Sequence, residues 1–252
     1  MSIVSMDQVP PHAVDPLLEV LVLHPRDAAG AHDGGADRLL VVEDPVSGGR
    51  SPEPAVVSAV CKETDLPVRA ILRLNDSWTT SGGELSRLAG LAADYLGSGV
   101  EGLAFGFLDA DLNVDVEVCV RLAEEIGLVP RTFHRAVDAS LETDHAWRAL
   151  RGLPNLDAVL SAGSARGLES GCDELTERAA RDPDVSRLLM AGGGLRGEHV
   201  PWLVRAGVHQ FHVATSVRPG ASWKAHVEAG HVRAWRMLLD DATDLAAGRP
   251  TG

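Results

Sequence analysis

Aromatic residues and cysteines are both scarce in this chain. Phe, Trp and Tyr make up only 4% of the 252 residues, so Val, Leu and Ala have to supply most of the packing in any core. The three cysteines, Cys61, Cys119 and Cys172, lie far apart and form neither a C-x-x-C pair nor a metal-ligand spacing. We therefore expect ordinary buried thiols in a reducing, cytoplasmic compartment.

Positive charge is also in short supply. The 23 Lys and Arg residues against 36 Asp and Glu residues leave a formal net charge of −13 at pH 7, which argues against a nucleic acid or an anionic membrane surface as partner. A local basic pocket stays compatible with this balance. No apolar run approaches the length of a membrane span, and no charged leader precedes an apolar segment, so no membrane association is expected.

Short β-forming runs alternate with helical patterns along nearly the whole chain, and its length with a hydrophobic content of 45% suits one large domain. The predicted strands cover residues 18–23, 36–42, 68–74, 100–107, the start of 128–139, 156–160, 187–191 and 208–214. The predicted helices cover residues 26–33, 52–64, 83–96, 114–126, 141–150, 168–180, 197–205 and 223–245.

Eight such strand–helix units predict an α/β protein with a parallel sheet, and at this length they fit a single closed (β/α)8 TIM-type barrel. An open doubly wound sheet is the competing architecture, but the first strand–helix turn lacks a G-x-G-x-x-G sequence. We expect one domain at residues 16–245, with a flexible lead-in at 1–15 and a flexible tail at 246–252.

A cluster of ionisable residues follows the fifth predicted strand, where residues 132–138 read T-F-H-R-A-V-D. Uncompensated charges in a buried wall cost several kcal/mol, so such residues indicate a functional demand. Strand alternation places Thr132 and His134 on the inner face and Phe133 on the outer face. The carboxyl end of a barrel strand is where this fold holds its chemistry. The alternative is a core histidine that is hydrogen-bonded to a neighbouring carbonyl.

Other polar residues are expected at the same rim. They are Arg73 at the end of strand three, Ser161 and Ser164 after strand six, His212 in strand eight, and Thr215 and Ser216 just beyond it. The three glycines at 192–194 predict an anion site, because the loops after strands seven and eight of barrels often present backbone N–H groups to phosphate. A tight turn is the alternative. Glu19, deeper in strand one, either faces a ligand or is the buried partner of an arginine.

Two histidines and two arginines around one rim suit an anionic ligand, with acid–base work by histidine. Metal binding by His134 and His212 with Glu19 or Asp138 is the alternative use, but ligands on separate strands leave no local spacing to test. The remaining histidines are expected in loops or on exposed helix faces, including His226 on the last helix.

The chain carries an ordered series of specific short segments. They are L-E-V at 18–20, G-G-A-D-R at 34–38, S-G-G at 47–49, Arg73, F-G-F-L-D at 105–109 with Asp115, T-F-H-R-A-V-D at 132–138, L-S-A-G at 160–163, A-G-G-G at 191–194 and F-H-V-A-T at 211–215. The string at 132–138 is the most specific. From about residue 18 to residue 215, the sequence resembles the CutC copper-homeostasis family.

The resemblance implies a TIM-type barrel, a cytoplasmic location, frequent homo-oligomers, and copper homeostasis or copper binding without a defined reaction. The chain also departs from the family pattern. Leu21 and Val42 stand where members often carry cysteines, Leu40 replaces an acidic residue and Gln210 replaces a glutamate. Because copper(I) prefers soft sulfur ligands, copper is implied by the resemblance alone, and no residue is assigned as a metal ligand.

We therefore expect a CutC-like barrel whose mouth binds a small anionic molecule, for example a phosphorylated one. The residues expected to carry chemistry are His134, Asp138, His212 and Arg73, with His134 as the acid–base residue and Arg73 as the anion clamp. The residues expected to bind the ligand are Glu19, Arg135, Ser161, Gly193, Gly194 and Thr215. Whether the chain is an enzyme stays open, although lyase or isomerase chemistry would suit such a mouth. The alternatives are a non-catalytic copper-binding or copper-responsive protein and a barrel kept as a scaffold.

Overall fold

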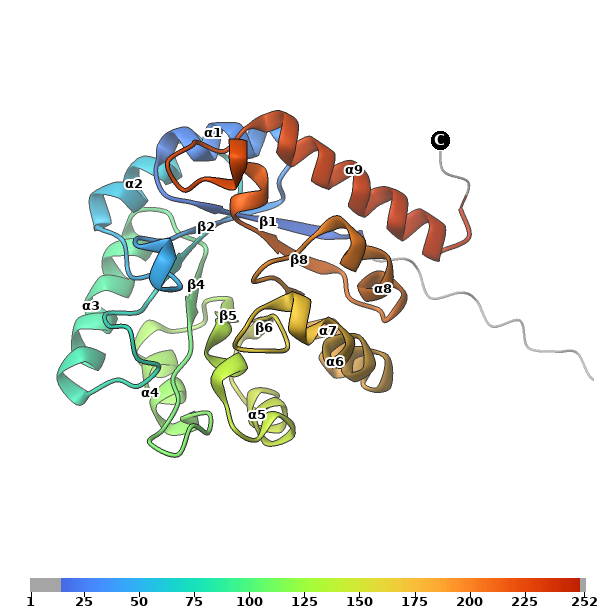
Figure 1. Ribbon diagram of the computed structural model, residues 1–252. Helices are drawn as coiled ribbons and strands as arrows, with labels where there is room; N and C mark the ends of the chain where they lie inside the picture. The colour runs from blue at the N-terminus through green and yellow to red at the C-terminus, as the bar shows by residue number, and fades with distance from the viewer. Residues whose placement is uncertain (1–14, 250–252) are drawn as a thin grey trace, which may run out of the picture.

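Eight parallel strands close into one barrel in the computed structural model, which describes residues 15–249 (Figure 1). Neighbouring strands in the sequence pair with each other, and β1 pairs with β8 to complete the ring. The strands are β1 (Leu17–Val22), β2 (Arg38–Val41), β3 (Val68–Ile71), β4 (Gly102–Phe105), β5 (Arg131–Phe133), β6 (Leu156–Ser161), β7 (Leu189–Ala191) and β8 (Gln210–Val213). The predicted single (β/α)8 TIM-type barrel is confirmed.

Helices cover the outside of the barrel (Figure 1). They are α1 (Pro25–Gly34), α2 (Pro54–Glu63), α3 (Gly82–Gly97), α4 (Val116–Ile126), α5 (Thr143–Leu150), α6 (Leu168–Arg181), α7 (Pro183–Leu188), α8 (Val200–Arg205) and α9 (Ala229–Ala246). Helix α9 contacts both α1 and α8, which joins the last unit to the first. None of the helices within residues 15–249 combines the length and the hydropathy of a membrane span.

Side chains alternate between the two faces of the barrel wall, as the strand period of two requires. In β1, Leu18, Val20 and Val22 are fully buried in the layer between the strands and the helices. Glu19 and Leu21 point into the barrel. The main core is therefore the layer outside the barrel, and Val, Leu and Ala supply most of it, as the composition predicts.

The barrel interior is polar towards the amino ends of the strands and apolar near their carboxyl ends. Arg69 of β3 donates hydrogen bonds to Thr132 of β5 at 2.5 Å and to Asp157 of β6 at 2.8 Å. Glu19 of β1 pairs with Arg38 of β2 at 2.6 Å. One layer further along, a cluster of apolar residues fills the interior: Leu21, Leu40, Val42, Ile71 and Ala104. The barrel interior is thus lined by apolar side chains from the first strands near its mouth, and by ion pairs at its base.

The last helix begins later than predicted. The pattern predicts a helix from residue 223, but α9 starts at Ala229, and His226 lies in the loop before it. The reason is that the N–H of Val227 donates to the Asp27 carboxylate and the N–H of Glu228 donates to the Val217 carbonyl. Contacts with distant parts of the chain replace the helical bonds that these groups would otherwise make.

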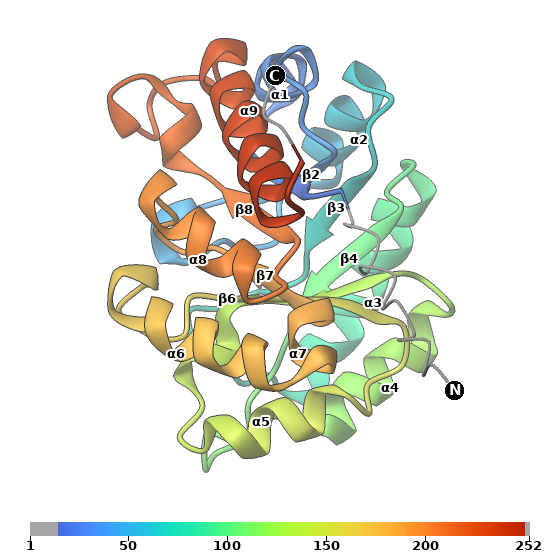
Figure 2. The ribbon, with the colours of Figure 1, turned by 90° about the vertical axis from the view of Figure 1, so that its right-hand side faces the viewer.

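The seventh strand is shorter than predicted, because residues 187 and 188 belong to α7, a helix missing from the prediction. Figure 2 shows α7 next to α6 on the outside of the barrel. Asp182 caps α7 by accepting hydrogen bonds from the N–H groups of Asp184 and Val185, and Pro183 occupies its first turn. An Asp-Pro pair is a recognisable start signal for a helix.

The ends of the predicted domain fall partly outside the described residues. The predicted lead-in at 1–15 lies outside them except for Asp15. In the predicted tail at 246–252, Ala246 is the last residue of α9, and residues 250–252 lie outside the described part. These limits stay predictions.

The approach of α6 to the loop after β6 can be tested with glycine substitutions. A Cβ added at Gly171 would lie 2.1 Å from the Ala162 carbonyl oxygen, whereas Gly90 in α3 has open space around it. We expect Gly171→Ala to lower the free energy of unfolding by about 1–3 kcal/mol through overpacking. The control Gly90→Ala should raise it by about 0.5–1 kcal/mol, because alanine favours the helix. Chemical denaturation measures both, and equal effects would contradict the close packing.

Candidate functional site

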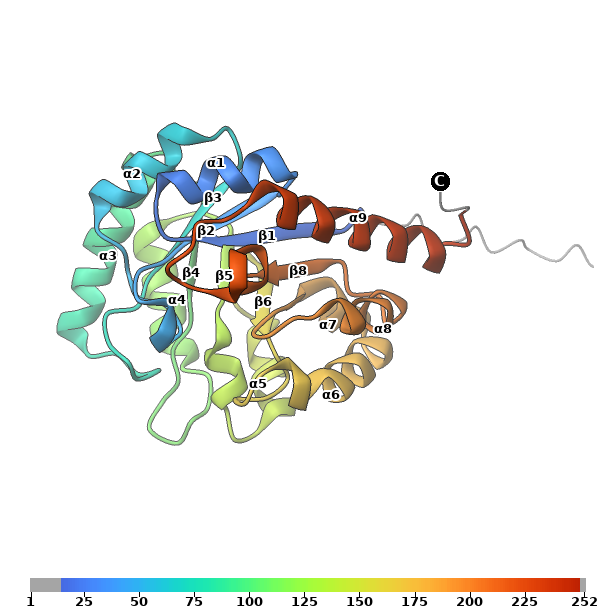
Figure 3. The same ribbon diagram turned by 45° about the horizontal axis from the view of Figure 1, so that its top comes forward.

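The carboxyl ends of the strands surround a cavity of about 260 Å³. Figure 3 shows the loop between β8 and α9, in orange and red, beside the ends of β1 and β8. Six of the predicted site residues line the cavity: His134, Arg135, Gly193, Gly194, His212 and Thr215. Four others are not among the residues that line it: Glu19, Arg73, Asp138 and Ser161. The two histidines from β5 and β8 therefore face one common space.

His134 lies directly after β5 and begins a short 3-10 turn, η2 (Arg135–Ala139). Its Nδ1 accepts a hydrogen bond from the Ala136 N–H at 3.2 Å, so the neutral ring carries its proton on Nε2. The residue is 3% exposed, and Nε2 has no hydrogen-bond partner among the described residues. Burial, together with the charge of Arg73, lowers the pKa of His134 to about 3. The imidazole is neutral at pH 7 and offers an N–H donor.

Glu19 orients His212. Its Oε1 lies 2.8 Å from His212 Nδ1, and its Oε2 accepts a hydrogen bond from Arg38 Nε at 2.6 Å. Although burial by itself raises it, the pKa of Glu19 is held well below its usual range by Arg38 and by the hydrogen bond from His212. The carboxylate thus keeps a proton on His212 Nδ1 and leaves Nε2 for the cavity. The alternative that Glu19 is the buried partner of an arginine is confirmed.

Asp138 and Ser161 position Arg135. The Asp138 carboxylate accepts hydrogen bonds from Arg135 Nε at 2.7 Å, from the Ser161 hydroxyl at 2.6 Å and from the Ala162 N–H at 3.0 Å. Arg135 Nη2 donates to the Ser164 carbonyl at 3.0 Å, whereas Nη1 has no partner within residues 15–249. Because the side chain is 31% exposed, this guanidinium is a cation available at the mouth.

Gly193 and Gly194 form the rim after β7, with φ angles of +76° and +96°. A Cβ at Gly193 would lie 2.7 Å from Arg135 Cζ, so the guanidinium packs directly on this backbone. Neither glycine donates its N–H to another group in the described part of the chain. The positive φ angles fit a tight turn, and the unbonded N–H groups fit an anion-binding rim.

Arg73 was predicted to clamp an anion, but its guanidinium is bonded to the protein backbone instead. Its guanidinium donates to the carbonyls of Ser47 at 2.8 Å, Gly49 at 3.0 Å and Asp76 at 2.7 Å, and it lies 4.3 Å from the centre of the Trp78 ring. These bonds tie the loops after β2 and β3 together. Because the nitrogens of Arg73 already donate to backbone carbonyls, Arg135 is the better candidate for binding an anion.

An apolar wall lies opposite the polar groups. Leu21, Leu40, Val42 and Ile71 from the first three strands line the same cavity as the histidines, together with Trp223. The first three are positions at which the chain departs from the CutC pattern. Strand register sets Leu21 beside Leu40, and this register cannot be read from local sequence. The wall was therefore missed, although Leu21, Leu40 and Val42 were each visible as a departure.

A larger hollow of about 410 Å³ lies on the outer surface, between α5, α6 and α7. Its walls carry charged residues that pair with one another, such as Arg178 and Asp144 at 2.6 Å. Ion pairs of this exposed kind are common on protein surfaces and carry little free energy. The cavity at the strand ends, with its converging histidines, is therefore the stronger candidate for a site.

The CutC family model matches residues 16–217. The chain belongs to the CutC family. The matched segment includes every residue that lines the mouth cavity except Trp223. The site geometry of this CutC protein is therefore built almost wholly from the family's own segment of the chain.

Relatives of this CutC protein match most of their own length. It is 29% identical over 238 residues to the family protein CutC of Klebsiella pneumoniae strain 342, covering 88% of this chain and 92% of the relative. It is 30% identical over 237 residues to that of Sodalis glossinidius, with 88% and 91% covered. These alignments are long enough to compare whole barrels.

Two solved structures share the fold. CutC from Streptococcus agalactiae has a TM-score of 0.68 at 19% identity, covering 78% of this chain and 97% of the other. A phosphoribosylanthranilate isomerase from Thermotoga maritima has a TM-score of 0.58 at 13% identity, covering 91% and 98%. At these identities the structures support the barrel fold alone.

The buried neutral His134 makes stability depend on pH. Its pKa is about 3 in the folded state and about 6.5 in an unfolded chain, so below pH 6.5 the unfolded state binds a proton that the folded state does not. The contribution of neutral His134 to the free energy of unfolding is complete above pH 6.5. It falls by up to about 1.4 kcal/mol per pH unit between pH 6.5 and 3. We expect the free energy of unfolding of His134→Asn to fall less steeply between pH 7 and 4 than that of the wild type.

In His134→Asn, an asparagine oxygen can accept the Ala136 N–H in place of Nδ1, so this hydrogen bond is kept. His145→Asn, at an exposed position of α5, is the control and should keep the wild-type slope. Glu19 and the other carboxyl groups titrate in all three proteins and cancel in the comparison. Urea denaturation at each pH gives the slopes, and parallel curves for the wild type and His134→Asn would contradict a buried neutral histidine.

Proposed function

We propose that this CutC protein binds a small anionic molecule, such as a phosphate ester, in the barrel mouth. The observation that carries the proposal is that, among the described residues, Nη1 of Arg135 and the nearby N–H groups of Gly193 and Gly194 all lack hydrogen-bond partners. Positive charge and backbone N–H groups after strands seven and eight are the usual phosphate-binding elements of TIM barrels. Thr215 and Ser216, in the loop after β8, line the same cavity and carry hydroxyl donors.

The apolar wall indicates where the rest of the ligand would lie. With its anionic group on Arg135, the remainder of the molecule would meet Leu21, Leu40 and Val42 across the cavity. Each Å² of apolar surface removed from water there contributes about 25 cal/mol. We therefore expect a ligand with an anionic end and a small apolar part, of a size suited to a cavity of about 260 Å³.

Proton transfer at the mouth would involve two imidazoles. His134, the predicted acid–base residue, is neutral and suited to donate from Nε2 to a ligand oxygen, as a neutral imidazole does when it polarises a carbonyl group. His212, held by Glu19, offers an Nε2 lone pair as a base. Lyase or isomerase chemistry would use such a pair, and no reaction is assigned.

Copper handling is the second candidate function, because the CutC family name is associated with copper homeostasis. The donor set at the mouth does not fit copper(I), which prefers sulfur ligands, since Leu21 and Val42 line it where family members often carry cysteines. The three cysteines lie instead on α2, α4 and α6. Burial raises the pKa of Cys119 to about 12, so this thiol keeps its proton and is a poor ligand. The free thiols support a cytoplasmic location, which we also propose.

Titration of phosphate ligands into the full chain at pH 7.5, measured by calorimetry, tests the proposed site. We expect phenyl phosphate to bind more tightly than inorganic phosphate, because its ring would bury against the apolar wall. Arg135→Met should weaken the binding of both by about 10-fold or more, since a hydrogen bond to a charged group contributes about 1.5–3 kcal/mol. Phosphate soaked into crystals should lie against the loops after β7 and β8.

Arg87→Met, at an exposed position of α3, is the matched control and should bind as the wild type does. Thermal denaturation checks that Arg135→Met is folded. Equal affinities in Arg135→Met and the wild type, or an anion bound elsewhere, would overturn the proposal. Copper(I) titrated under reducing conditions decides for the second candidate if binding is stoichiometric, survives replacement of all three cysteines and is lost in His134→Ala.

A further inference from the structure

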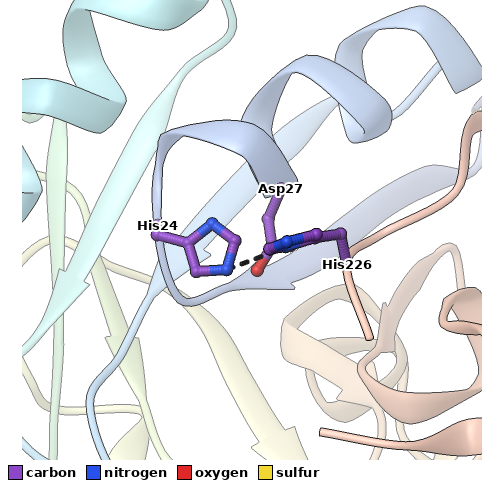
Figure 4. Close-up of side chains that lie close together, drawn as sticks. All are labelled: His24, Asp27 and His226. Atoms are coloured by element: carbon purple, nitrogen blue, oxygen red, sulfur yellow. Dashed lines mark ion pairs between the residues drawn. The ribbon is translucent and has the colours of Figure 1, made fainter. Parts of the chain in front are cut away.

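A second group of ligating side chains lies where the first strand–helix unit meets the last. His24 follows β1, Asp27 lies in the first turn of α1, and His226 lies in the loop before α9. Asp27 Oδ1 is 3.9 Å from His24 Nε2 and 3.5 Å from His226 Nδ1. Figure 4 shows the two imidazole rings approaching the carboxylate from different segments of the chain. Both histidines were expected in loops or on exposed helix faces, and His226 lies in the loop before α9 rather than on that helix.

The backbone fixes this group in place. Asp27 is fully buried and accepts hydrogen bonds from the N–H groups of Leu23 at 2.9 Å and Val227 at 3.0 Å, which are the neighbours of the two histidines. Gly30 allows the close approach, because a Cβ there would lie 2.4 Å from the Val227 carbonyl oxygen. The carboxylate therefore holds both histidine-bearing segments without using either imidazole.

One imidazole nitrogen of the group is buried without a hydrogen-bond partner among the described residues. This atom is Nδ1 of His226. Buried polar atoms in native proteins normally have a protein or water partner, and a bound ion is one explanation where the protein supplies none. The side chains of His24 and His226 are 38% and 41% exposed, so an ion can reach the group from solvent.

We propose that His24, Asp27 and His226 bind one divalent transition-metal ion of the zinc type. Imidazole and carboxylate ligands suit Zn²⁺, Cu²⁺ and Ni²⁺, whereas Ca²⁺ and Mg²⁺ prefer oxygen ligands alone. Ligand atoms about 2.1 Å from a tetrahedral ion lie about 3.4 Å apart, and the three ligand atoms in this group lie within 4.8 Å of one another. Side-chain rotation closes the difference and leaves a fourth position for water.

Arg218 limits the strength of the proposed site. Its guanidinium donates to Asp27 at 2.7 Å and 3.2 Å, so the carboxylate shares its charge with a cation before any metal binds. We therefore expect weaker binding than at a closed structural zinc site. The guanidinium also lies 5.6 Å from the ring of Trp223, a residue of the mouth wall. Trp223 also lies in the same loop as His226, before α9, so an ion bound by His226 would hold that loop.

Zinc titration of the metal-free full chain tests the site, with calorimetry at pH 7.5, above the ordinary histidine pKa of about 6.5. We expect one Zn²⁺ per chain. His24→Ala and His226→Ala should each weaken binding by at least about 10-fold, the loss that follows even when a metal site loses an outer partner. His145→Ala, which removes an exposed histidine of α5, should bind zinc as the wild type does.

Copper(II) serves as a second probe, because its electron paramagnetic resonance spectrum reports bound nitrogen atoms. We expect nitrogen coupling in the wild type and less of it in either variant, and both variants should melt as the wild type does in a chelator. Equal zinc affinity in the wild type and both variants, or no saturable binding by the wild type, would overturn the site. Arg135→Met should bind zinc normally, so this proposal and the phosphate site fail or stand independently.

Discussion

The carboxylate of Glu19 lies inside the barrel without solvent exposure, and it binds Arg38 and His212 from the two strands that flank β1. Removing it would leave the Arg38 charge buried without its partner, which is the costly way to break a buried ion pair. The same carboxylate sets the tautomer of His212 at the mouth. One side chain therefore links the two strands that flank β1 and orients an imidazole at the open end of the barrel.

The arginines explain how the proposed anion site is compatible with a chain of net charge −13. Arg38 and Arg218 are neutralised by buried carboxylates, and Arg73 is surrounded by backbone carbonyls. Arg135 shares only part of its guanidinium with Asp138 and keeps Nη1 unbonded within residues 15–249. The local arrangement of the cations, rather than their number, therefore determines the charge that the mouth presents.

The barrel could be predicted from sequence because strand and helix patterns are local, and the meeting of His134 with Gly193 followed from where barrel strands end. The role of Arg73 could not, because its partners are carbonyls of loops whose paths no local pattern encodes. The predicted start of α9 was wrong for a similar reason, because the N–H of Val227 donates to Asp27, which is far away in the sequence. Helix α7, by contrast, carried a readable start signal that was overlooked.

The contact between the first and last strand–helix units, where β1 pairs with β8, affects the order in which the chain folds. The hydrogen bonds from His212 to Glu19 and from Arg218 to Asp27 join residues separated by 193 and 191 positions. Such distant contacts form late, and during synthesis the amino-terminal units emerge well before their partners. Until β8 arrives, β1 is an open edge strand with a charged Glu19 on its inner face. An inward-pointing charge of this kind discourages edge-to-edge association, so the residue that later closes the barrel also guards the nascent chain against aggregation.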